Sequence, residues 1–342
     1  MTDLYPFRFN PLFRQYIWGG RRLHSQLNKP IGEGDDFAES WELVDHADDQ
    51  SVCAAGPLAG RTLSELIKTR GDDLLGESCM KKIGDSNRPP RLLNRFPLLM
   101  KYLDANRVLS VQVHPDDRYG ATMPIPDLGK TEAWFVLHAE PGSLIYAGLK
   151  EGVTEAELRK AVNEGRTEDC LHTIHPRRGD CVFIPAGTVH AIGAGLVIAE
   201  IQQSSDTTFR LFDWNRFDKD GNARPLHIEQ SFEVIDFKRG PVQPQKPTKL
   251  ETPDGSVAER LVDCDKFVLN RWKFEQPTEL GGDGRFRLLT MTSGSAKVDG
   301  DPSGEPLALA NTILLPACLG PTLITPDSEA ELLEISMPTQ DC

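Results

Sequence analysis

The sequence predicts an all-β protein built from two jelly-roll domains with small helical additions. Glycine and proline account for 29 and 25 of the 342 residues, so the chain turns often. The apolar residues form short runs or alternate with polar ones, which is typical of antiparallel strands in barrels and jelly rolls. A proline-rich stretch divides these runs into a longer first group and a shorter second group.

Two short helices are predicted by capping boxes, in which a threonine and a glutamate three residues later cap a helix start. Thr62 and Glu65 precede one apolar helical pattern, and Thr154 and Glu157 precede another. Neither helix carries residues that suggest chemistry.

Strands are predicted wherever the period is two or the apolar run is short. In chain order these segments are 98–103, 108–114, 133–138, 143–149, 180–187, 197–202, 208–214, 287–293, 296–300 and 311–317.

The proline-rich stretch at 239–256 contains four prolines and little apolar periodicity, which favours a linker between domains. We therefore expect a first domain at 1–240 and a smaller C-terminal β domain at 241–342.

Charge and composition exclude several classes of protein. The chain has 38 Lys and Arg against 51 Asp and Glu, a net charge of −13 without any basic block, so nucleic acid is not an expected partner. No apolar run is long enough to span a bilayer and the N-terminus lacks a signal-peptide pattern, so we expect no membrane partner and a cytoplasmic location. The seven scattered cysteines contain no CxxC pair, which favours free thiols.

The segment LSVQVHPDD alternates cleanly, so Gln112 and His114 are expected on one face of a strand and Val111 and Val113 on the other. An amide and an imidazole two residues apart inside a barrel suit a metal ion or a polar ligand. A hydrogen-bonded structural histidine is the alternative.

Lys130 and Glu132 show the same spacing in the segment GKTEAWFVL. They could add an oxygen ligand and a cation to the same cavity, or form an exposed ion pair on an edge strand.

The segment RGDCVFIPAGTVHAIGAG predicts a strand, a tight turn and a second strand that bears His190. Residues 184–187 fit a type I turn with proline at its second and glycine at its fourth position. This pattern occurs in metal sites of cupin-like jelly rolls, because the turn fixes the face on which the imidazole lies.

Glu200 and Gln202 are expected on one face of the next strand, and Arg210 follows after a turn through Asp206. An arginine between Phe209 and Leu211 needs an anion. That anion could be a phosphate or carboxylate ligand, or an internal carboxylate, from Glu200 or Asp206.

Together, two histidines, a glutamine and a carboxylate form a ligand set suited to a zinc-like divalent ion. A lysine and an arginine nearby could bind an anionic substrate.

Six segments also carry a resemblance to a known family. The chain is similar to the type I mannose-6-phosphate isomerases, specifically their short bacterial form, in the segments YIWGGRRL, FAESWEL, FPLLMKYLDANRVLSVQVHPDD, GKTEAWFVL, FIPAGTVHAI and IAEIQQSSDTTFRLFDWNR. The matching stretches lie between about residues 16 and 239, and the region after Lys238 matches loosely.

The resemblance implies a role for individual residues. It implies that one zinc ion per chain is bound by Gln112, His114, Glu132 and His190. It implies that the sugar phosphate is surrounded by Trp18, Glu39, Lys101, Ser110 and Lys130, with Glu200, Asp206 and Arg210 on the far wall and Arg216 as a further contact to phosphate. Arg210, Lys130, Glu200 and Asp206 are the implied catalytic residues.

The implied reaction converts mannose 6-phosphate to fructose 6-phosphate in the first domain. A metal ion and cations near O1 and O2 would stabilise negative charge on oxygen, which favours an enediol intermediate. The sequence does not fix the oligomeric state, and a monomer is favoured. The group that transfers the proton is left open among a metal-linked histidine or water, Lys130, Glu200 and Asp206. Two alternatives are a non-catalytic sugar-phosphate-binding cupin and a metal-dependent cupin oxygenase. A sensor should lack a ligand or Arg210, and the glutamine and anion-binding cations argue against an oxygenase.

Overall fold

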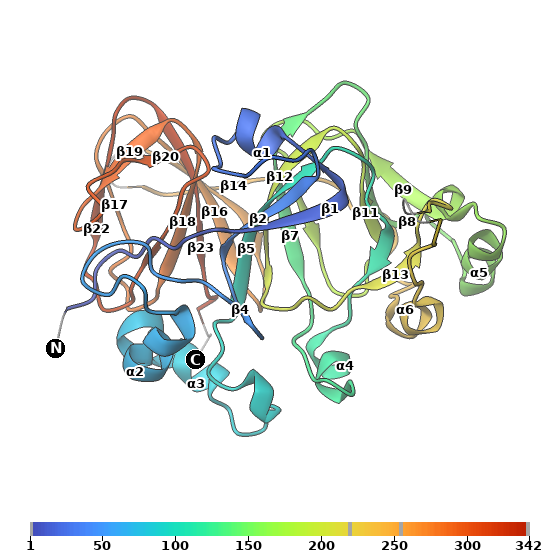
Figure 1. Cartoon of the computed structure of the whole chain (residues 1–342), viewed down its shortest axis with the longest axis horizontal. Helices are drawn as coiled ribbons and strands as arrows, with labels where there is room; N and C mark the ends of the chain where they lie inside the picture. The colour runs from blue at the N-terminus through green and yellow to red at the C-terminus, as the bar shows by residue number, and fades with distance from the viewer. Residues whose placement is uncertain (1–2, 218–220, 253–255, 340–342) are drawn as a thin grey trace.

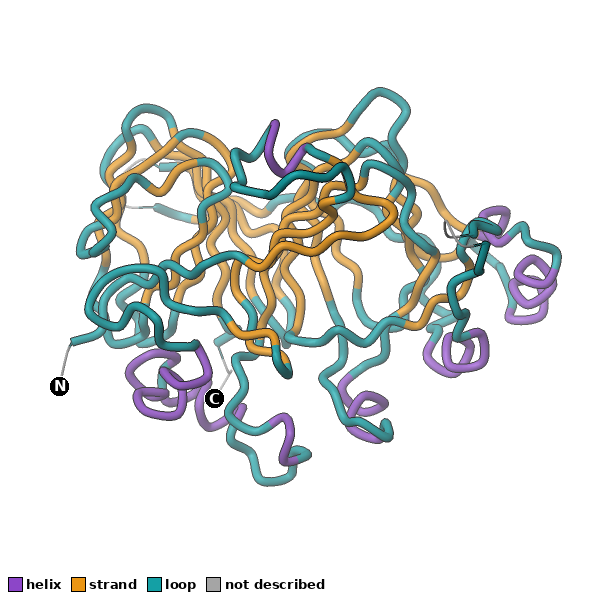
Figure 2. Tube along the Cα trace, viewed as in Figure 1, coloured by secondary structure: helices purple, strands orange, loops and turns teal. Residues whose placement is uncertain are grey.

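The computed structural model describes residues 3–217, 221–252 and 256–339, and strands dominate these ranges (Figure 2). Four larger antiparallel sheets lie one behind another across the molecule, and a two-stranded pair, β3 (Asp45–His46) and β4 (Asp49–Gln50), lies at one edge. The predicted all-β class is therefore confirmed.

Apart from β3 and β4, the described strands before residue 213 form two sheets that face each other. The six-stranded sheet has the order β1 (Leu12–Gly20), β2 (Phe37–Leu43), β5 (Leu98–Ala105), β12 (Leu196–Gln203), β7 (Glu132–Ala139) and β10 (Cys181–Ile184). The five-stranded sheet has the order β13 (Phe209–Phe212), β6 (Val111–Val113), β11 (His190–Ile192), β8 (Ile145–Leu149) and β9 (Leu171–Ile174). We call this pair of sheets the first sandwich.

The later strands form a second sandwich, drawn in orange and red in Figure 1. Its six-stranded sheet has the order β14 (Thr248–Leu250), β15 (Val257–Asp263), β16 (Val268–Phe274), β23 (Ala330–Ser336), β18 (Arg287–Ser293) and β21 (Thr312–Leu315). Its four-stranded sheet has the order β17 (Thr278–Leu280), β22 (Thr322–Pro326), β19 (Ser295–Val298) and β20 (Leu307–Ala308).

The helices lie at the periphery (Figure 1). They are α1 (Arg22–Ser25), α2 (Leu63–Leu75), α3 (Glu77–Ile83), α4 (Asp117–Thr122), α5 (Glu155–Asn163) and α6 (Ile228–Val234), with 3-10 turns at Pro90–Leu92 and Thr167–Cys170. Both predicted capping boxes are present, at the start of α2 and of α5. None of the helices in the described part of the chain has the length and apolar character needed to cross a bilayer.

The expected linker makes backbone hydrogen bonds with the first sandwich. Val242 N donates to Ala147 O at 3.0 Å and Gln245 N donates to Cys181 O at 2.7 Å. The chain then enters β14 at Thr248, while residues 253–255 of the expected linker lie outside the described residues. The boundary at residue 240 stays a prediction.

The two six-stranded sheets pack face to face through one continuous apolar core. Phe135 and Met100 of the first sandwich share this core with Leu288 and Ile335 of the second. Because β5, β7 and β12 also face the interior of their own sandwich, they are buried on both sides, which explains why their sequences are almost continuously apolar.

Alternation assigns each residue of these strands to one of two cores. On β7, Ala133 and Phe135 face the shared core, whereas Trp134 and Val136 face the interior of the first sandwich. The candidate site lies on that interior face.

Candidate metal centre and cavity

Three charged residues interrupt the apolar inward face of the central strands. Glu132 lies on β7, Glu200 on β12 and Lys101 on β5. The strand register places Glu200 opposite Lys101, and Gln202 opposite Glu132. Because the pairing is antiparallel, carboxylates and an ammonium from distant parts of the sequence meet at one place in the sheet.

The two histidines reach the same place from the facing sheet. His190 begins β11 and is paired in register with Gln112 of β6, and His114 directly follows the end of β6. Ligating atoms of His114, Glu132 and His190 lie within 4.8 Å of one another, and all three residues are buried. The structure thus brings together three of the four predicted metal ligands, and Gln112 lines the adjoining cavity.

The turn before His190 differs from the predicted one by a single residue. Thr188 N donates to Pro185 O at 3.1 Å, so the turn spans Pro185 to Thr188. Gly187 has a φ of 84° and occupies the third position, where type II turns need a positive φ. The expected type I turn at 184–187 is wrong because Gly187 N donates instead to His114 O, at 2.8 Å.

Backbone carbonyls fix the orientation of both imidazole rings. His114 Nδ1 lies 3.0 Å from Thr207 O, and His190 Nδ1 lies 2.9 Å from Thr188 O. Because a carbonyl accepts only, each Nδ1 carries the proton and each Nε2 presents a lone pair to the cluster. This arrangement is the one that metal-ligating histidines adopt.

Two atoms of the cluster show that its donor set suits a cation. Glu132 Oε1 and His190 Nε2 are buried without a hydrogen-bond partner, and they lie 3.3 Å apart. Two lone-pair atoms facing each other in a buried place are unfavourable unless a positive charge lies near them. The residues therefore fit a divalent metal ion.

Lys130 supplies a positive charge to part of this cluster. Its Nζ donates to His114 Nε2 at 2.9 Å and to Glu132 Oε2 at 2.7 Å. Both acceptors are atoms that a metal ion would use, so metal binding requires the ammonium to move away from them.

Burial keeps both imidazoles in their neutral, ligating form. It lowers the pKa of His190 to about 3 and that of His114 well below its ordinary value, and the Lys130 ammonium acts in the same direction. Burial raises the pKa of Glu132 to about 7, although Lys130 opposes this shift. A bound divalent cation would favour the carboxylate form of Glu132.

Beside the cluster lies a cavity of about 320 Å³ that is mostly polar. Nine predicted site residues line it: Trp18, Glu39, Lys101, Ser110, Gln112, Lys130, Glu200, Asp206 and Arg210. The structure therefore gathers the predicted substrate-contacting residues around one cavity, with Arg216 as the exception.

Lys101 holds two carboxylates at the wall of this cavity. Its Nζ lies 3.3 Å from Glu200 Oε1 and 3.5 Å from Glu39 Oε1. Burial lowers the pKa of Lys101, but the Glu200 and Glu39 carboxylates outweigh burial and raise it. Burial opposes ionisation of Glu200, yet Lys101 and Lys130 lower its pKa, so Glu200 is present as a carboxylate.

Arg210 does not form either of the internal ion pairs that the sequence left open. No carboxylate of a described residue lies within ion-pair distance of its guanidinium, whose Nη1 donates to Pro225 O at 2.9 Å. Its Nε is buried without a described partner. Arg210 is therefore available to an external anion.

Besides apolar residues, sequence reasoning missed three residues with polar groups that line the cavity, namely Tyr16, Thr208 and Arg224. Tyr16 could have been found, since it stands two residues before Trp18 on β1 and stacks on its ring at 5.6 Å. Arg224 had no sequence signal, because it stands in a segment without apolar periodicity.

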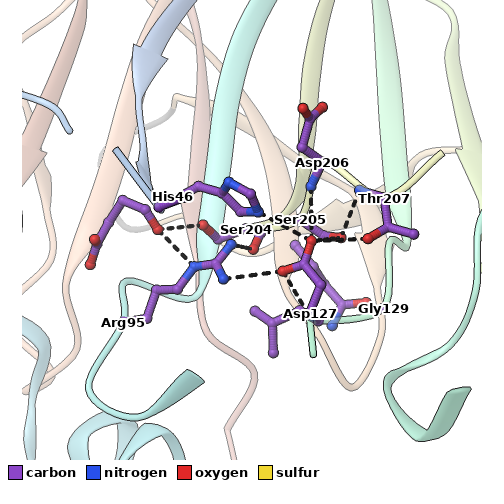
Figure 3. A network of polar contacts seen from close by, with 12 residues as sticks. His46, Arg95, Asp127, Gly129, Ser204, Ser205, Asp206 and Thr207 are labelled. Atoms are coloured by element: carbon purple, nitrogen blue, oxygen red, sulfur yellow. Dashed lines mark hydrogen bonds and ion pairs between the residues drawn. The ribbon is translucent and has the colours of Figure 1, made fainter. Parts of the chain in front are cut away.

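A hydrogen-bond network holds the loop that carries Asp206 (Figure 3). The buried Asp127 carboxylate accepts hydrogen bonds from Ser205 Oγ and Thr207 Oγ1, both at 3.0 Å, and from Arg95 Nη1 at 3.1 Å. His46 Nε2 lies 3.1 Å from the same carboxylate. The network thus fixes Thr207, whose carbonyl orients His114.

Comparisons with known proteins agree with this geometry. A sequence model described as phosphomannose isomerase type I, catalytic domain, matches residues 6–143. The chain is 34% identical over 316 residues to mannose-6-phosphate isomerase ManA of Bacillus subtilis, covering 92% of this chain and 94% of ManA. It is 35% identical over 314 residues to the mannose-6-phosphate isomerase of Streptococcus mutans, covering 89% and 93% of the two chains.

The fold agrees as well. A crystal structure of mannose 6-phosphate isomerase from Bacillus subtilis superimposes with a TM-score of 0.83 and 27% identity, covering 97% of this chain and 99% of that one. Since similarity extends over nearly the whole length of relatives more than 30% identical, the chain belongs to the type I phosphomannose isomerase family.

Proposed function

We propose that this chain is a zinc-dependent enzyme that interconverts mannose 6-phosphate and fructose 6-phosphate through an enediol intermediate. The observation that carries the proposal is the buried cluster of His114, Glu132 and His190 beside a cavity lined by cations. Family membership and the activity named for relatives along nearly their full length support the same reaction.

The metal would be held by His114, Glu132 and His190, with Gln112 as the fourth ligand. Two imidazoles with carboxylate and amide oxygens are a donor set that zinc accepts. A divalent ion held by these residues would act as a Lewis acid and so make the hydrogen next to the sugar carbonyl easier to remove as a proton.

The residues of the chain would bind the sugar and move its proton. Glu200, which is ionised and lines the cavity, takes the proton from C2 and returns it to C1, while the hydroxyl proton of O2 passes to O1. Lys130 leaves the donor atoms when the metal binds, but it also lines the cavity, where its ammonium stabilises the negative charge that develops on the enediolate oxygens. Trp18 and Ser110 line the wall against which the sugar lies.

Arg210 would bind the phosphate group from the opposite side of the cavity. Its guanidinium can bind two phosphate oxygens at once, and no described carboxylate occupies it. This cation explains how a protein with a net charge of −13 can bind an anionic substrate.

The decisive experiment measures fructose 6-phosphate formed from mannose 6-phosphate before chelation, after chelation, and after zinc is returned. We expect activity to disappear with the metal and to return with zinc. A zinc-loaded protein that does not turn over mannose 6-phosphate would contradict the proposal.

The enediol route is tested by running the reaction in heavy water. Proton transfer through a base predicts deuterium at C1 of fructose 6-phosphate, read by NMR. Complete retention of a C2 label at C1 after many reversible turnovers would instead indicate a hydride shift.

A further inference from the structure

Three arginines and one aspartate gather at the end of the cavity that lies near β13. Asp213 accepts from Arg224 Nε at 2.8 Å, from Arg224 Nη2 at 2.5 Å and from Arg216 Nη2 at 2.5 Å. Arg210 pairs with no described carboxylate. Among the described residues, two positive charges of this cluster have no counter-charge, which is a strong attraction for an anion.

Only two of these arginines face the cavity. Arg210 and Arg224 line it, whereas Arg216 does not. The three nitrogens of the Arg216 guanidinium all bind protein oxygens, with Nη1 donating to Val108 O at 2.6 Å and Nε to Asp213 O at 3.3 Å. The second arginine of the cavity is therefore Arg224.

Arg224 lines the cavity and keeps one guanidinium nitrogen without a partner among the described residues. Its Nε and Nη2 are bound to Asp213, and Nη1 has no hydrogen-bond partner in the described part of the chain. Thr208, whose hydroxyl likewise has no described partner, lines the same end of the cavity. Donors from two arginines and a threonine suit the tetrahedral oxygens of a phosphate.

The backbone fixes the two guanidiniums relative to each other. The chain at 224–227 runs beside β13, where His227 N donates to Arg210 O at 2.8 Å and Arg210 N donates to His227 Nδ1 at 3.1 Å. Arg210 Nη1 in turn binds the carbonyl of Pro225, the residue after Arg224. The pair is thus arranged before any ligand binds, which reduces the entropy lost on binding.

We propose that Arg224 is a substrate-binding residue which, together with Arg210, binds the phosphate group of the sugar phosphate. This inference rests on the proposed function and adds to it the residue that recognises the phosphate. Burial lowers the pKa of Arg210, and the neighbouring Arg224 and Arg216 lower it further, so a bound dianion would relieve a repulsion already present in the protein.

The test compares Arg224→Ala and Arg224→Lys with wild-type and with Arg239→Ala, an arginine outside the cavity that pairs with Asp236. Loss of charged hydrogen bonds to phosphate should raise KM for mannose 6-phosphate about 10- to 100-fold in Arg224→Ala, with kcat changed less than about 3-fold. Arg224→Lys keeps the positive charge but lacks the planar guanidinium, so its KM should lie between the values of wild-type and Arg224→Ala. Arg239→Ala should match wild-type.

Unphosphorylated mannose supplies the specificity control. Its turnover should be equally slow in wild-type and Arg224→Ala, because the lost contact is to phosphate alone. An unchanged KM for mannose 6-phosphate in Arg224→Ala, or a rise in KM seen only in Arg216→Ala, would overturn the assignment.

Binding of inorganic phosphate separates this inference from the proposed function. Phosphate should raise the thermal midpoint of wild-type more than that of Arg224→Ala, whether or not the protein turns over mannose 6-phosphate. If wild-type shows no turnover but this difference is present, the function fails and the assignment of Arg224 holds. If both proteins respond equally to phosphate, the assignment of Arg224 fails.

Discussion

Replacing Asp127 with asparagine should weaken both the fold and the metal site. Asp127 is 8% exposed, and its carboxylate is the buried counter-charge of Arg95, which is 7% exposed. Breaking a buried ion pair by removing one partner costs about 3–5 kcal/mol. Arg95 keeps its hydrogen bonds to the carbonyls of Asp45 and Ser204, so we expect a loss near 3 kcal/mol in the free energy of unfolding.

The metal site should respond because the network reaches one of its ligands. Asp127 holds Thr207 through its hydroxyl, and Thr207 O orients His114 through Nδ1. Residues that orient metal ligands typically contribute about 10- to 100-fold to metal affinity or activity. Asp127→Asn should therefore bind zinc about 10- to 100-fold more weakly.

Urea unfolding measures the first effect, and zinc titration of the metal-free protein at a temperature well below the unfolding midpoint measures the second. Asp169→Asn is the matched control, because Asp169 pairs with Arg166 on the surface and should change stability by less than about 0.5 kcal/mol. Wild-type zinc affinity in a folded Asp127→Asn variant would refute the argument that this network positions His114.

Three further predictions follow from the site and the packing. His190→Ala should purify with less than one zinc per chain, and full occupancy by elemental analysis would contradict its assignment as a ligand. Arg210→Ala and Arg210→Lys should keep the metal but lose most of kcat/KM, since only the planar fork binds phosphate at two points; near wild-type kinetics would remove Arg210 from the site. The fragment 1–240 should be insoluble or lack a cooperative thermal transition, because Phe96 and Phe135 would lose the core they share with the second sandwich. A soluble, active fragment with a sharp transition would show that the second sandwich is dispensable.

Features that depend on residues close together in the chain could be predicted from the sequence. The capping boxes at Thr62 and Thr154 depend on contacts three residues apart, and both occur as predicted. Gln112 and His114, two residues apart near one short strand, both lie at the site, as the alternation predicts.

Contacts between segments that are distant in the chain could not be predicted from the sequence. Arg224 meets Asp213 and Arg210 only because the chain at 224–227 lies beside β13, and no local pattern encodes that pairing. The network around Asp127 likewise joins residues about 80 positions apart. Helix α4 has six residues, which is too short for an apolar period to stand out.

The central strands of the first sandwich have no solvent-facing side, so each residue on them belongs to one of two cores. On β5, Met100 faces the other sandwich, and its neighbour Lys101 faces the cavity. On β12, Ile201 likewise faces the other sandwich, and its neighbour Glu200 faces the cavity. Neighbouring residues on such a strand therefore lie on opposite sides of the sheet, one at the junction of the two sandwiches and the next at the cavity that binds the sugar. The two sides of the sheet can for this reason change separately during evolution. Substitutions on one side can adjust how the two sandwiches pack while the chemistry on the other side is kept.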